Sequence, residues 1–363
     1  MIYQDKYDRI VKACRQITSH RQALAKPALE ELLLGRIDPG VANEDLLAHL
    51  IAEALMRRID RQLVESKNIF VQGFDIPQIT LFYSMAEAVP FVYAGHSAAN
   101  QFLLREAAAL SRFTLFDIGI GNGRQAVRLL QALTGRRRPE AVTVVGLDPV
   151  SNNLEQAREA IEAAGADLPF AVEFRPMLGM LESIDPGELR GVTRLPGDGL
   201  LINSAFTLHH TMHPIGDCTL RTDLIARLAE LQPRALALVE PSSNHDTEQL
   251  AKRVHHSWEH FGHVFALIDE AQIDERHKYL IKEKFFGREI RDIFGVSDYF
   301  RCERHELYDS WLLRFHKAGF QPLPHADLCV ELPDYCSHVV SDGLVRFNYR
   351  DVTIVAAMGF SPR

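Results

Sequence analysis

The sequence has no long apolar segment. None of its apolar runs approaches the roughly 18 residues that a membrane-spanning helix needs. The first residues, MIYQDKYDRIVKACRQ, contain no apolar core of the kind that a secretion signal has. The five cysteines are scattered and include no C-x-x-C pair, which argues against a zinc ribbon or a disulfide framework. We therefore expect a cytoplasmic protein.

The sequence also lacks an excess of charge of one sign. It contains 40 Lys and Arg against 48 Asp and Glu, a net charge of −8 in 363 residues. This balance argues against a general binder of nucleic acid or of an anionic membrane. The hydrophobic fraction of 47% and the charged fraction of 24% are ordinary for a globular protein. A chain of this length can form one large domain or two smaller ones.

The first hundred residues have the pattern of helices. Apolar side chains between Leu46 and Leu63 recur at helical spacing, so we expect residues 1–100 to form a helical cap. After residue 110, short apolar runs begin about 30 residues apart, the length of one strand–helix unit. These runs cover residues 113–118, 142–147, 171–174, 199–202 and 235–239. Such alternation predicts a parallel sheet with helices on both faces.

The pattern changes after the fifth apolar run. We expect a helical insertion at about 245–300, a helix near 304–317, and two last strands near 326–331 and 351–358. The last two strands are expected to form an antiparallel edge. The predicted fold class is therefore α/β, with a doubly wound and mostly parallel sheet, and residues 101–363 form its core.

A glycine-rich loop follows the first predicted strand. It contains Asp117, Gly119, Gly121 and Gly123 and leads into a helix. Glycines allow a tight turn and the close approach of a ligand, and a helix N-terminus offers unpaired N–H groups to a negatively charged group. The spacing G-x-G-x-G differs from the dinucleotide pattern G-x-G-x-x-G, because Arg124 stands in place of the third glycine. The pattern D-x-G-x-G-x-G is typical of S-adenosylmethionine sites.

The next predicted strand ends in an acidic residue, Asp148. A carboxylate at this place can accept hydrogen bonds from ribose hydroxyls. The alternative interpretation is that Asp148 only caps the helix that begins near Ser151. The loop and Asp148 together predict S-adenosylmethionine as the cofactor. Asn203, near the end of a later strand, is a further candidate for holding its methionine part.

Several blocks of the sequence resemble the GRAS family and occur in the same order as in that family. The resemblance covers roughly residues 80–360. The matching blocks are PFVYAGHSAANQ at 90–101, LINSAFTLHH at 201–210, LVE at 238–240 with NH at 244–245, FGREI at 286–290, and RCERHE at 301–306 with Trp311 and AGF at 318–320.

The GRAS resemblance implies a fold similar to that of class I methyltransferases, a seven-stranded Rossmann-like sheet with a helical cap. The best-known GRAS proteins are plant transcriptional regulators, which usually have a degraded glycine loop. This chain retains the three glycines and Asp148, and it has FNYRD at 347–351 in place of a tryptophan-rich segment. It therefore resembles a bacterial-type GRAS protein, a group expected to be methyltransferases that act on small molecules.

The candidate catalytic residues lie where predicted strands end. His209 and His210 follow the fourth strand, and Glu240 ends the fifth. Each can act as a general base if the methyl acceptor must lose a proton. The alternatives are a core or capping role for a histidine and an ion pair for Glu240. The expected partner is a small-molecule methyl acceptor, with neither nucleic acid nor membrane, and a homodimer is left open.

Four further residues are candidates for contacting the substrate: Asn100, Asn244, Arg304 and Glu306. The planar guanidinium of Arg304 can bind a carboxylate. The alternatives are an ion-pair network for Arg304 and a helix N-cap for Asn244. No metal is expected, because the helical histidines between 256 and 263 lack the H-E-x-x-H pattern.

Two other functions are consistent with the residues. The main alternative is a GRAS-type regulatory or interaction module that binds a small molecule or a protein without catalysis, since a fold alone does not establish an activity. A nicotinamide-dependent oxidoreductase is the weaker alternative, because the glycine spacing disfavours it. The sequence contains no nucleophile elbow and no phosphate-binding lysine motif, so a hydrolase or a kinase has no support.

Overall fold

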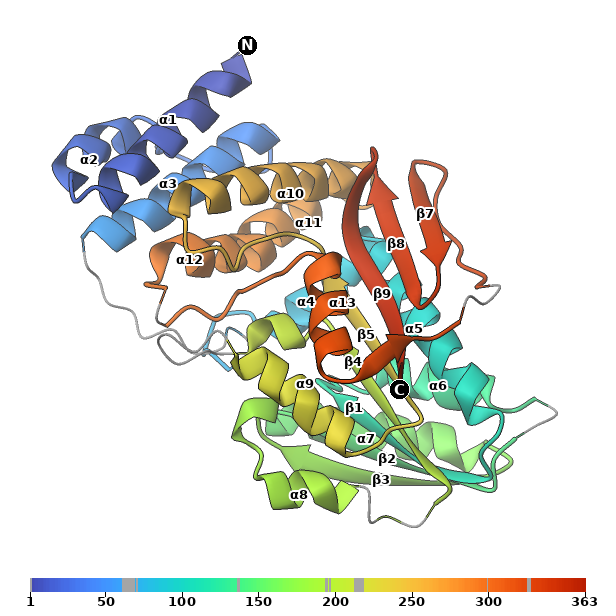
Figure 1. The fold of residues 1–363 in the computed structure, drawn as a ribbon. Helices are drawn as coiled ribbons and strands as arrows, with labels where there is room; N and C mark the ends of the chain where they lie inside the picture. The colour runs from blue at the N-terminus through green and yellow to red at the C-terminus, as the bar shows by residue number, and fades with distance from the viewer. Residues whose placement is uncertain are drawn as a thin grey trace.

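The computed structural model describes residues 2–60, 69, 71–135, 138–192, 195, 197–211, 219–298, 300–324 and 328–363. Figure 1 shows a twisted sheet flanked by helices and a separate group of helices at one end of it. The helices are α1 (Ile2–Thr18), α2 (Gln22–Glu30), α3 (Asn43–Ile59), α4 (Gln78–Ala88), α5 (Phe91–Ala107), α6 (Arg124–Ala132), α7 (Ser151–Ala166), α8 (Pro186–Gly191), α9 (Leu220–Glu230), α10 (Leu250–Glu270), α11 (Glu275–Leu280), α12 (Gly287–Gly295) and α13 (Tyr308–Lys317). Short turns η1 (Leu181–Ser183) and η3 (Leu208–His210) are of the 3₁₀ type, and η4 (Ile281–Phe286) is a π-helical turn between α11 and α12.

One mixed sheet contains all the described strands. The strands are β1 (Arg112–Ile118), β2 (Ala141–Asp148), β3 (Ala171–Leu178), β4 (Gly199–Ala205), β5 (Ala235–Pro241), β6 (Phe320–Pro322), β7 (Cys336–Ser341), β8 (Leu344–Tyr349) and β9 (Val352–Pro362). Their order is β3-β2-β1-β4-β5-β9-β8-β7, with β6 also paired to β9. The first five strands pair in parallel, and all pairs made by the other four are antiparallel.

The sheet differs from the predicted one. A mixed α/β fold is confirmed, but the predicted seven strands and mostly parallel order are wrong, because the sheet formed by the described residues has nine strands and a large antiparallel part. The strand expected near 326–331 is absent from the described residues 328–331, and the hairpin β7–β8 forms the edge instead. Its turn contains Asp342-Gly343, with Gly343 at a φ of 58°. A two-residue Asp-Gly turn is a hairpin signal that the sequence analysis missed.

Alternate side chains of the parallel strands enter two different cores. In β1, Phe113 and Leu115 pack in a core shared with α5, α6 and α7, whereas Phe116 and Ile118 pack in a core shared with α9 and α13. Successive side chains of a strand point to opposite faces of the sheet. A strand buried on both faces is therefore a nearly continuous apolar run, which explains why the sequence located β1, β2, β4 and β5. β3 is largely exposed, and the run at 171–174 marks only its first half.

The helices at the end of the sheet come from distant parts of the sequence. α3 packs against α12, and α1 packs against α10, so the expected cap and the expected insertion contribute to one group of helices (Figure 1). α5 lies instead on the sheet, in contact with β5 and β9. The division into a cap of residues 1–100 and a core of residues 101–363 stays a prediction. No helix among the described residues is long and apolar enough to cross a membrane.

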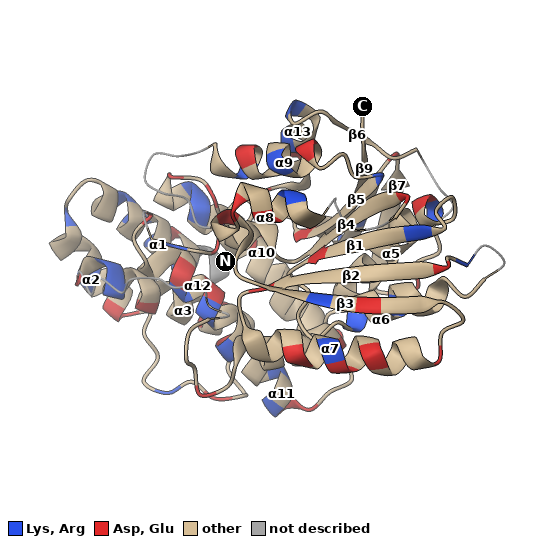
Figure 2. Cartoon of the chain, turned by 90° about the horizontal axis from the view of Figure 1, so that it is seen from below, with Lys and Arg blue, Asp and Glu red and all other residues tan. Residues whose placement is uncertain are grey.

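Acidic and basic side chains are mixed on the outer helices. Figure 2 shows both kinds alternating along α7. There, Arg158 lies 3.6 Å from a carboxylate oxygen of Glu155 and 3.6 Å from one of Glu162. Such exposed pairs contribute little to stability, but they leave this helix without a block of charge of one sign.

Candidate functional site

A large cavity, called here the larger cavity, lies at the carboxyl ends of the parallel strands. It encloses about 1000 Å³ of empty space, part of it open to solvent. Its walls come from the loop after β1, the end of β2, the segments after β3 and β4, and α4. Here the strand order changes direction, because β1 has β2 on one side and β4 on the other. Ligands of open α/β sheets bind at such a point.

The glycine loop needs its glycines for the fold itself. Gly119, Gly121 and Gly123 have φ angles of 77°, 56° and 78°, which side chains with a Cβ atom rarely adopt. A Cβ atom on Gly119 would lie only 2.0 Å from Oγ1 of Thr207, on the loop after β4. Backbone geometry therefore accounts for these residues whether or not a ligand binds.

Tyr83 of α4 covers the glycine loop. Its hydroxyl accepts a hydrogen bond of 2.9 Å from the N–H of Asn122, and a Cβ atom on Gly121 would meet the same hydroxyl at 2.9 Å. Burial raises the pKa of Tyr83 to about 12. Part of the hydrogen-bonding capacity expected to receive a ligand is therefore used by a side chain that the sequence analysis missed. No local sequence signal connects the two segments.

Asp148 lines the cavity and also organises the backbone around it. Its Oδ1 atom accepts hydrogen bonds from the N–H of Val150 at 2.9 Å and from Nδ2 of Asn153 at 3.0 Å. Its Oδ2 atom accepts one from the N–H of Gly121 at 3.1 Å. A carboxylate can accept about four hydrogen bonds, so capacity for another donor is left. The two interpretations of Asp148, structural and ligand-binding, are thus compatible.

Asp117 begins a chain of buried hydrogen bonds that connects two residues of the cavity wall, Asp117 and Gln125, with Asn203 and Asn100. Its Oδ1 atom accepts a hydrogen bond of 2.8 Å from Nδ2 of Asn203. The amide oxygen of Asn203 in turn accepts a hydrogen bond of 3.1 Å from Nε2 of Gln125. Gln125 also donates to Asn100 Oδ1 at 3.2 Å. Burial raises the pKa of Asp117 to about 7. Asp117 and Gln125 line the larger cavity, whereas Asn203 and Asn100, predicted to touch cofactor and substrate, do not.

His209 and Glu240 meet as a pair. Nδ1 of His209 lies 2.5 Å from Oε2 of Glu240, and the N–H of Leu208 donates to Oε1 of the same carboxyl at 2.8 Å. Burial raises the pKa of Glu240 to about 8. Burial, together with the nearby charges of His210 and Arg221, lowers the pKa of His209 well below its usual range. Both side chains lie outside the larger cavity, and His209 lines a second, smaller one.

His210 reaches both cavities and pairs with Glu303. Its Nδ1 atom lies 2.9 Å from Oε1 of Glu303. Burial would lower the pKa of His210, but the carboxylate of Glu303 outweighs it and raises that pKa. Glu303 belongs to residues 301–306, a buried segment between α12 and α13. The three residues predicted as catalytic therefore lie together, but inside the protein.

The other predicted substrate residues are engaged elsewhere. Arg304 donates a hydrogen bond of 2.9 Å to Oδ1 of Asp246. Glu306 accepts a hydrogen bond of 2.5 Å from Nη1 of the buried Arg221. Asn244 is half-buried and precedes α10, whose N-cap is Gln249, so the N-cap alternative for Asn244 is wrong. These contacts connect the insertion to the sheet. Among the described residues, the lining of the larger cavity includes none of the three.

Three buried histidines from different segments extend the cluster around His209. The ring centroid of His305 lies 4.4 Å from that of His209, and the ring of His245 lies 4.8 Å from that of His305. His260 of α10 lies 5.6 Å from His245. His245 and His305 lie in blocks that resemble the GRAS family, but neither residue was predicted to have a role. Only the tertiary structure brings them together.

Comparison with known proteins identifies a family and several relatives of the chain. The model of the GRAS domain family matches residues 7–332. The Arabidopsis thaliana Scarecrow-like transcription factor PAT1 is 27% identical over 261 residues, which are 69% of this chain and 52% of that protein. DELLA protein RGL3 from the same plant is 27% identical over 288 residues, 76% of this chain and 52% of its own length. The chain thus spans about half the length of the curated relatives it matches.

A solved structure has the same fold. SCL7 of Oryza sativa aligns with a TM-score of 0.77 over 98% of this chain and 99% of that chain, at 18% sequence identity. This likeness extends over the sheet and the helices together.

These relatives correct the predicted function. The expectation of an S-adenosylmethionine-dependent methyltransferase is wrong, because the relatives are named as a transcription factor and as DELLA and Scarecrow-like proteins. The prediction gave too much weight to the intact glycine loop. The structure explains why: the fold needs glycine beside Thr207, and His209 and Glu240 are engaged with each other.

The expected partners and source are corrected on the same grounds. A small-molecule methyl acceptor, without nucleic acid, was the predicted partner, whereas one relative is named a transcription factor. The bacterial assignment is also wrong, since the matching relatives come from Arabidopsis thaliana and Oryza sativa. Net charge describes a whole chain, so it did not decide whether nucleic acid is a partner.

Proposed function

Because the chain belongs to the GRAS domain family, we propose that it is a non-catalytic regulatory module whose larger cavity binds a small molecule. S-adenosylmethionine, or another molecule with an adenosine group, is the first candidate ligand. The observation that carries the proposal is Asp148, a buried carboxylate that lines the cavity beside the glycine loop and retains capacity for another hydrogen-bond donor.

The strand order supports this choice of ligand. The five parallel strands have the order β3-β2-β1-β4-β5, which corresponds to five of the six strands of the Rossmann order 3-2-1-4-5-6. In that arrangement a ribose is bound by an acidic residue at the end of the second strand, the place of Asp148 in β2. We therefore propose that this half of the sheet is Rossmann-like and that its antiparallel half is the part that departs from it.

We propose a non-catalytic module because of where the candidate general bases lie. Among the described residues, the lining of the larger cavity includes His210 but neither His209 nor Glu240. His210 is held beside Glu303. A general base must reach the proton that it removes, directly or through one water molecule.

Tyr83 supplies a way for the ligand to act on the rest of the protein. A ligand group that takes the N–H of Asn122 must displace the hydroxyl of Tyr83. Tyr83 belongs to α4, which packs against η4 and α5. Exchange of one hydrogen bond for another costs little net free energy, about 1 kcal/mol or less. Binding is therefore expected to loosen α4, and a regulatory module needs such a change to transmit its ligand state.

Calorimetric titration with S-adenosylmethionine and S-adenosylhomocysteine tests the ligand. We expect saturable binding of one molecule per chain and at least tenfold weaker binding to Asp148→Asn, since a charge-assisted hydrogen bond contributes about 1.5–3 kcal/mol. Asn153→Ala removes a hydrogen bond to Asp148 but keeps the carboxylate, so it should retain most of the affinity. Asp167→Asn, at the exposed end of α7, is the neutral control.

The outcomes separate the parts of the proposal. No binding of either compound at millimolar concentration would remove the adenosine-type ligand. Equal losses in Asp148→Asn and Asn153→Ala would mean that the carboxylate only supports the loop. Incubation with a small-molecule cell extract should return S-adenosylmethionine unchanged, and repeated turnover to S-adenosylhomocysteine would contradict a non-catalytic role.

Location belongs to the proposal as well. The four described cysteines, Cys14, Cys302, Cys329 and Cys336, are free thiols. Free thiols persist in a reducing compartment, so we propose that the protein works in the cytoplasm or in a compartment of similar redox state.

A further inference from the structure

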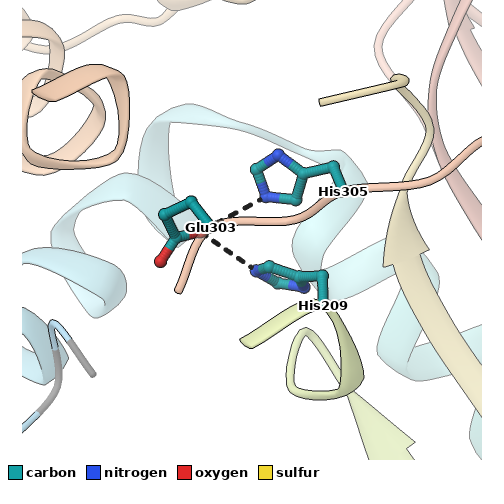
Figure 3. Close-up of side chains that lie close together, drawn as sticks. All are labelled: His209, Glu303 and His305. Atoms are coloured by element: carbon teal, nitrogen blue, oxygen red, sulfur yellow. Dashed lines mark ion pairs between the residues drawn. The ribbon is translucent and has the colours of Figure 1, made fainter. Parts of the chain in front are cut away.

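Three buried side chains of the histidine cluster face a common point. His209 lies in η3, while Glu303 and His305 lie in the segment between α12 and α13 (Figure 3). Oε2 of Glu303 lies 3.7 Å from Nε2 of His209 and 3.6 Å from Nε2 of His305. One ligand atom from each residue can be chosen so that all three lie within 4.8 Å of one another.

These distances resemble those between ligands of a bound metal ion. Zinc binds histidine nitrogen and carboxylate oxygen at about 2.0–2.1 Å, and a tetrahedral arrangement then places its ligand atoms about 3.3–3.4 Å apart. The observed separations of 3.6 and 3.7 Å exceed this by only a few tenths of an ångström. Two histidines and one carboxylate form a donor set that zinc uses in proteins.

Both histidines have a hydrogen-bond partner at the ring nitrogen that faces away from Glu303. Nδ1 of His209 lies 2.5 Å from the carboxyl of Glu240. Nδ1 of His305 lies 2.6 Å from Nδ1 of His245, whose Nε2 lies 2.9 Å from the hydroxyl of Ser243. Metal-binding histidines almost always have such a partner, because a proton held at one nitrogen leaves the lone pair of the other for the metal.

Glu303 provides an independent indication of a bound cation. It is 0% exposed, and no hydrogen bond of normal geometry from the described residues reaches either of its carboxylate oxygens. Oε1 lies at ion-pair distance from His210, whereas Oε2 lies near the ring nitrogens of both His209 and His305. A buried carboxylate oxygen is costly unless it is hydrogen-bonded or coordinates a metal.

The backbone around Glu303 is firmly held. The carboxylate of Asp292 accepts hydrogen bonds from the N–H groups of Cys302 and Glu303, at 2.8 and 2.7 Å. Arg221 donates a hydrogen bond of 3.0 Å to the carbonyl oxygen of His209. The three donor atoms are therefore set by the fold before any metal binds, which reduces the cost of ordering them on binding.

We propose that His209, Glu303 and His305 bind one zinc ion, which joins the segment after β4 to the segment between α12 and α13. This site is separate from the adenosine-type cavity and does not depend on the proposed function. It differs from the sequence-based expectation of no metal, which considered only the histidines of α10. Because the ion would join residues that are distant in the sequence, it would stabilise the folded chain.

The test uses the full chain without an affinity tag, treated with a chelator and then titrated with Zn²⁺. We expect one zinc per chain by elemental analysis, saturable heat on titration, and a rise of several degrees in the midpoint of thermal unfolding. Co²⁺ should bind in the same place and give visible d–d absorption typical of nitrogen and oxygen ligands. No bound metal, and no shift in the midpoint, would overturn the proposal directly on the unmodified protein.

Matched variants locate the ion. Glu303→Gln and His305→Gln should each lose the stoichiometric zinc and the thermal shift, whereas His263→Gln, on the partly exposed side of α10, should keep both. Retention of one zinc by both ligand variants would overturn the assignment. If these variants fold poorly, Cys302→Ser still distinguishes the proposed site from a neighbouring one. Cys302, His210 and Glu303 form a neighbouring group that could hold a metal. Loss of zinc in Cys302→Ser, with a thiolate charge-transfer band in the wild-type cobalt spectrum, would place the ion there instead.

Discussion

The N–H of Asn122 donates a hydrogen bond of 2.9 Å to the hydroxyl of Tyr83, and so connects the glycine loop to α4. The two residues are 39 positions apart in the sequence. The same loop donates to Asp148 through Gly121. The loop is therefore satisfied by the protein on two sides before any ligand binds, and a ligand must compete with a tyrosine that belongs to a different layer of the fold.

Tyr83→Phe removes this competitor. Without the hydroxyl, the N–H of Asn122 is free for a ligand group, so we expect the affinity for S-adenosylmethionine to rise about five- to tenfold, the equivalent of roughly 1 kcal/mol. Calorimetric titration measures the change. Tyr93→Phe, on α5, is the control, since Tyr93 contacts Arg128 and does not line the larger cavity. An unchanged or weaker affinity in Tyr83→Phe would mean that the ligand does not use Asn122.

Gly119→Ala should destabilise the fold whether or not a ligand is present. The added Cβ atom would lie 2.0 Å from Oγ1 of Thr207, at a φ of 77°. Left-handed backbone and overpacking each cost about 1–3 kcal/mol, so we expect a loss of about 3 kcal/mol or more in the free energy of unfolding, measured with urea. Gly135→Ala, which has open space around it, should change it little. Equal free energies of unfolding for Gly119→Ala and the wild-type protein would show that the loop can relax around the added Cβ atom.

The buried carboxyl of Asp117 should make stability depend on pH. Burial raises its pKa to about 7, above the ordinary value of 3.8. Between these two pH values the folded state holds a proton that the unfolded state has released, so this contribution to stability is full below about pH 4 and falls as the pH rises toward 7. Asp117→Asn keeps an acceptor for Asn203 and should remove that fall. Urea unfolding at several pH values measures it, with Glu173→Gln on β3 as the exposed control. A parallel pH dependence in Asp117→Asn and wild type would contradict the shift.

Glu306→Gln should act on stability and not on the ligand. Arg221 is 1% exposed and lies 2.5 Å from Glu306. Arg221 would then keep the more distant carboxylate of Asp246, at 3.9 Å. Removal of one charge from a buried pair typically costs about 3–5 kcal/mol. Glu140→Gln, which removes an exposed pair with Arg112, should cost less than about 1 kcal/mol. Thermal unfolding and titration with S-adenosylmethionine separate the two effects. A large loss of affinity in a stable Glu306→Gln protein would return Glu306 to the ligand site.

Much of the fold was predictable because it depends on local patterns. The apolar runs that became β1, β2, β4 and β5 are largely buried on both faces, so each appears in the sequence without its partners, whereas β3 is largely exposed. The hairpin β7–β8 was missed because β7 is largely exposed and carries no apolar run. The resemblance to the GRAS family was also readable from contiguous blocks, and the family model confirms it.

The candidate site was predictable only in part. The glycine spacing and Asp148 indicated where a cavity lies, because both follow directly from the ends of strands. The roles of Asn203, Arg304 and Glu306 were not readable, since each depends on partners in other segments, Asp117, Asp246 and Arg221. A polar residue at a strand end looks the same in sequence whether it faces a cavity or an internal hydrogen bond.

By itself, the sequence determined the parallel half of the sheet, the turn at the glycine loop and the family of the protein. These depend on side-chain periodicity and on backbone freedom, which are properties of neighbouring residues. Only the tertiary structure decided that Tyr83 covers the loop, that Glu240 pairs with His209 31 positions away, and that His245 and His305, 60 positions apart, share one buried cluster. Such contacts are set by how the layers pack, because burial forces each polar group to find whichever partner the fold brings near it.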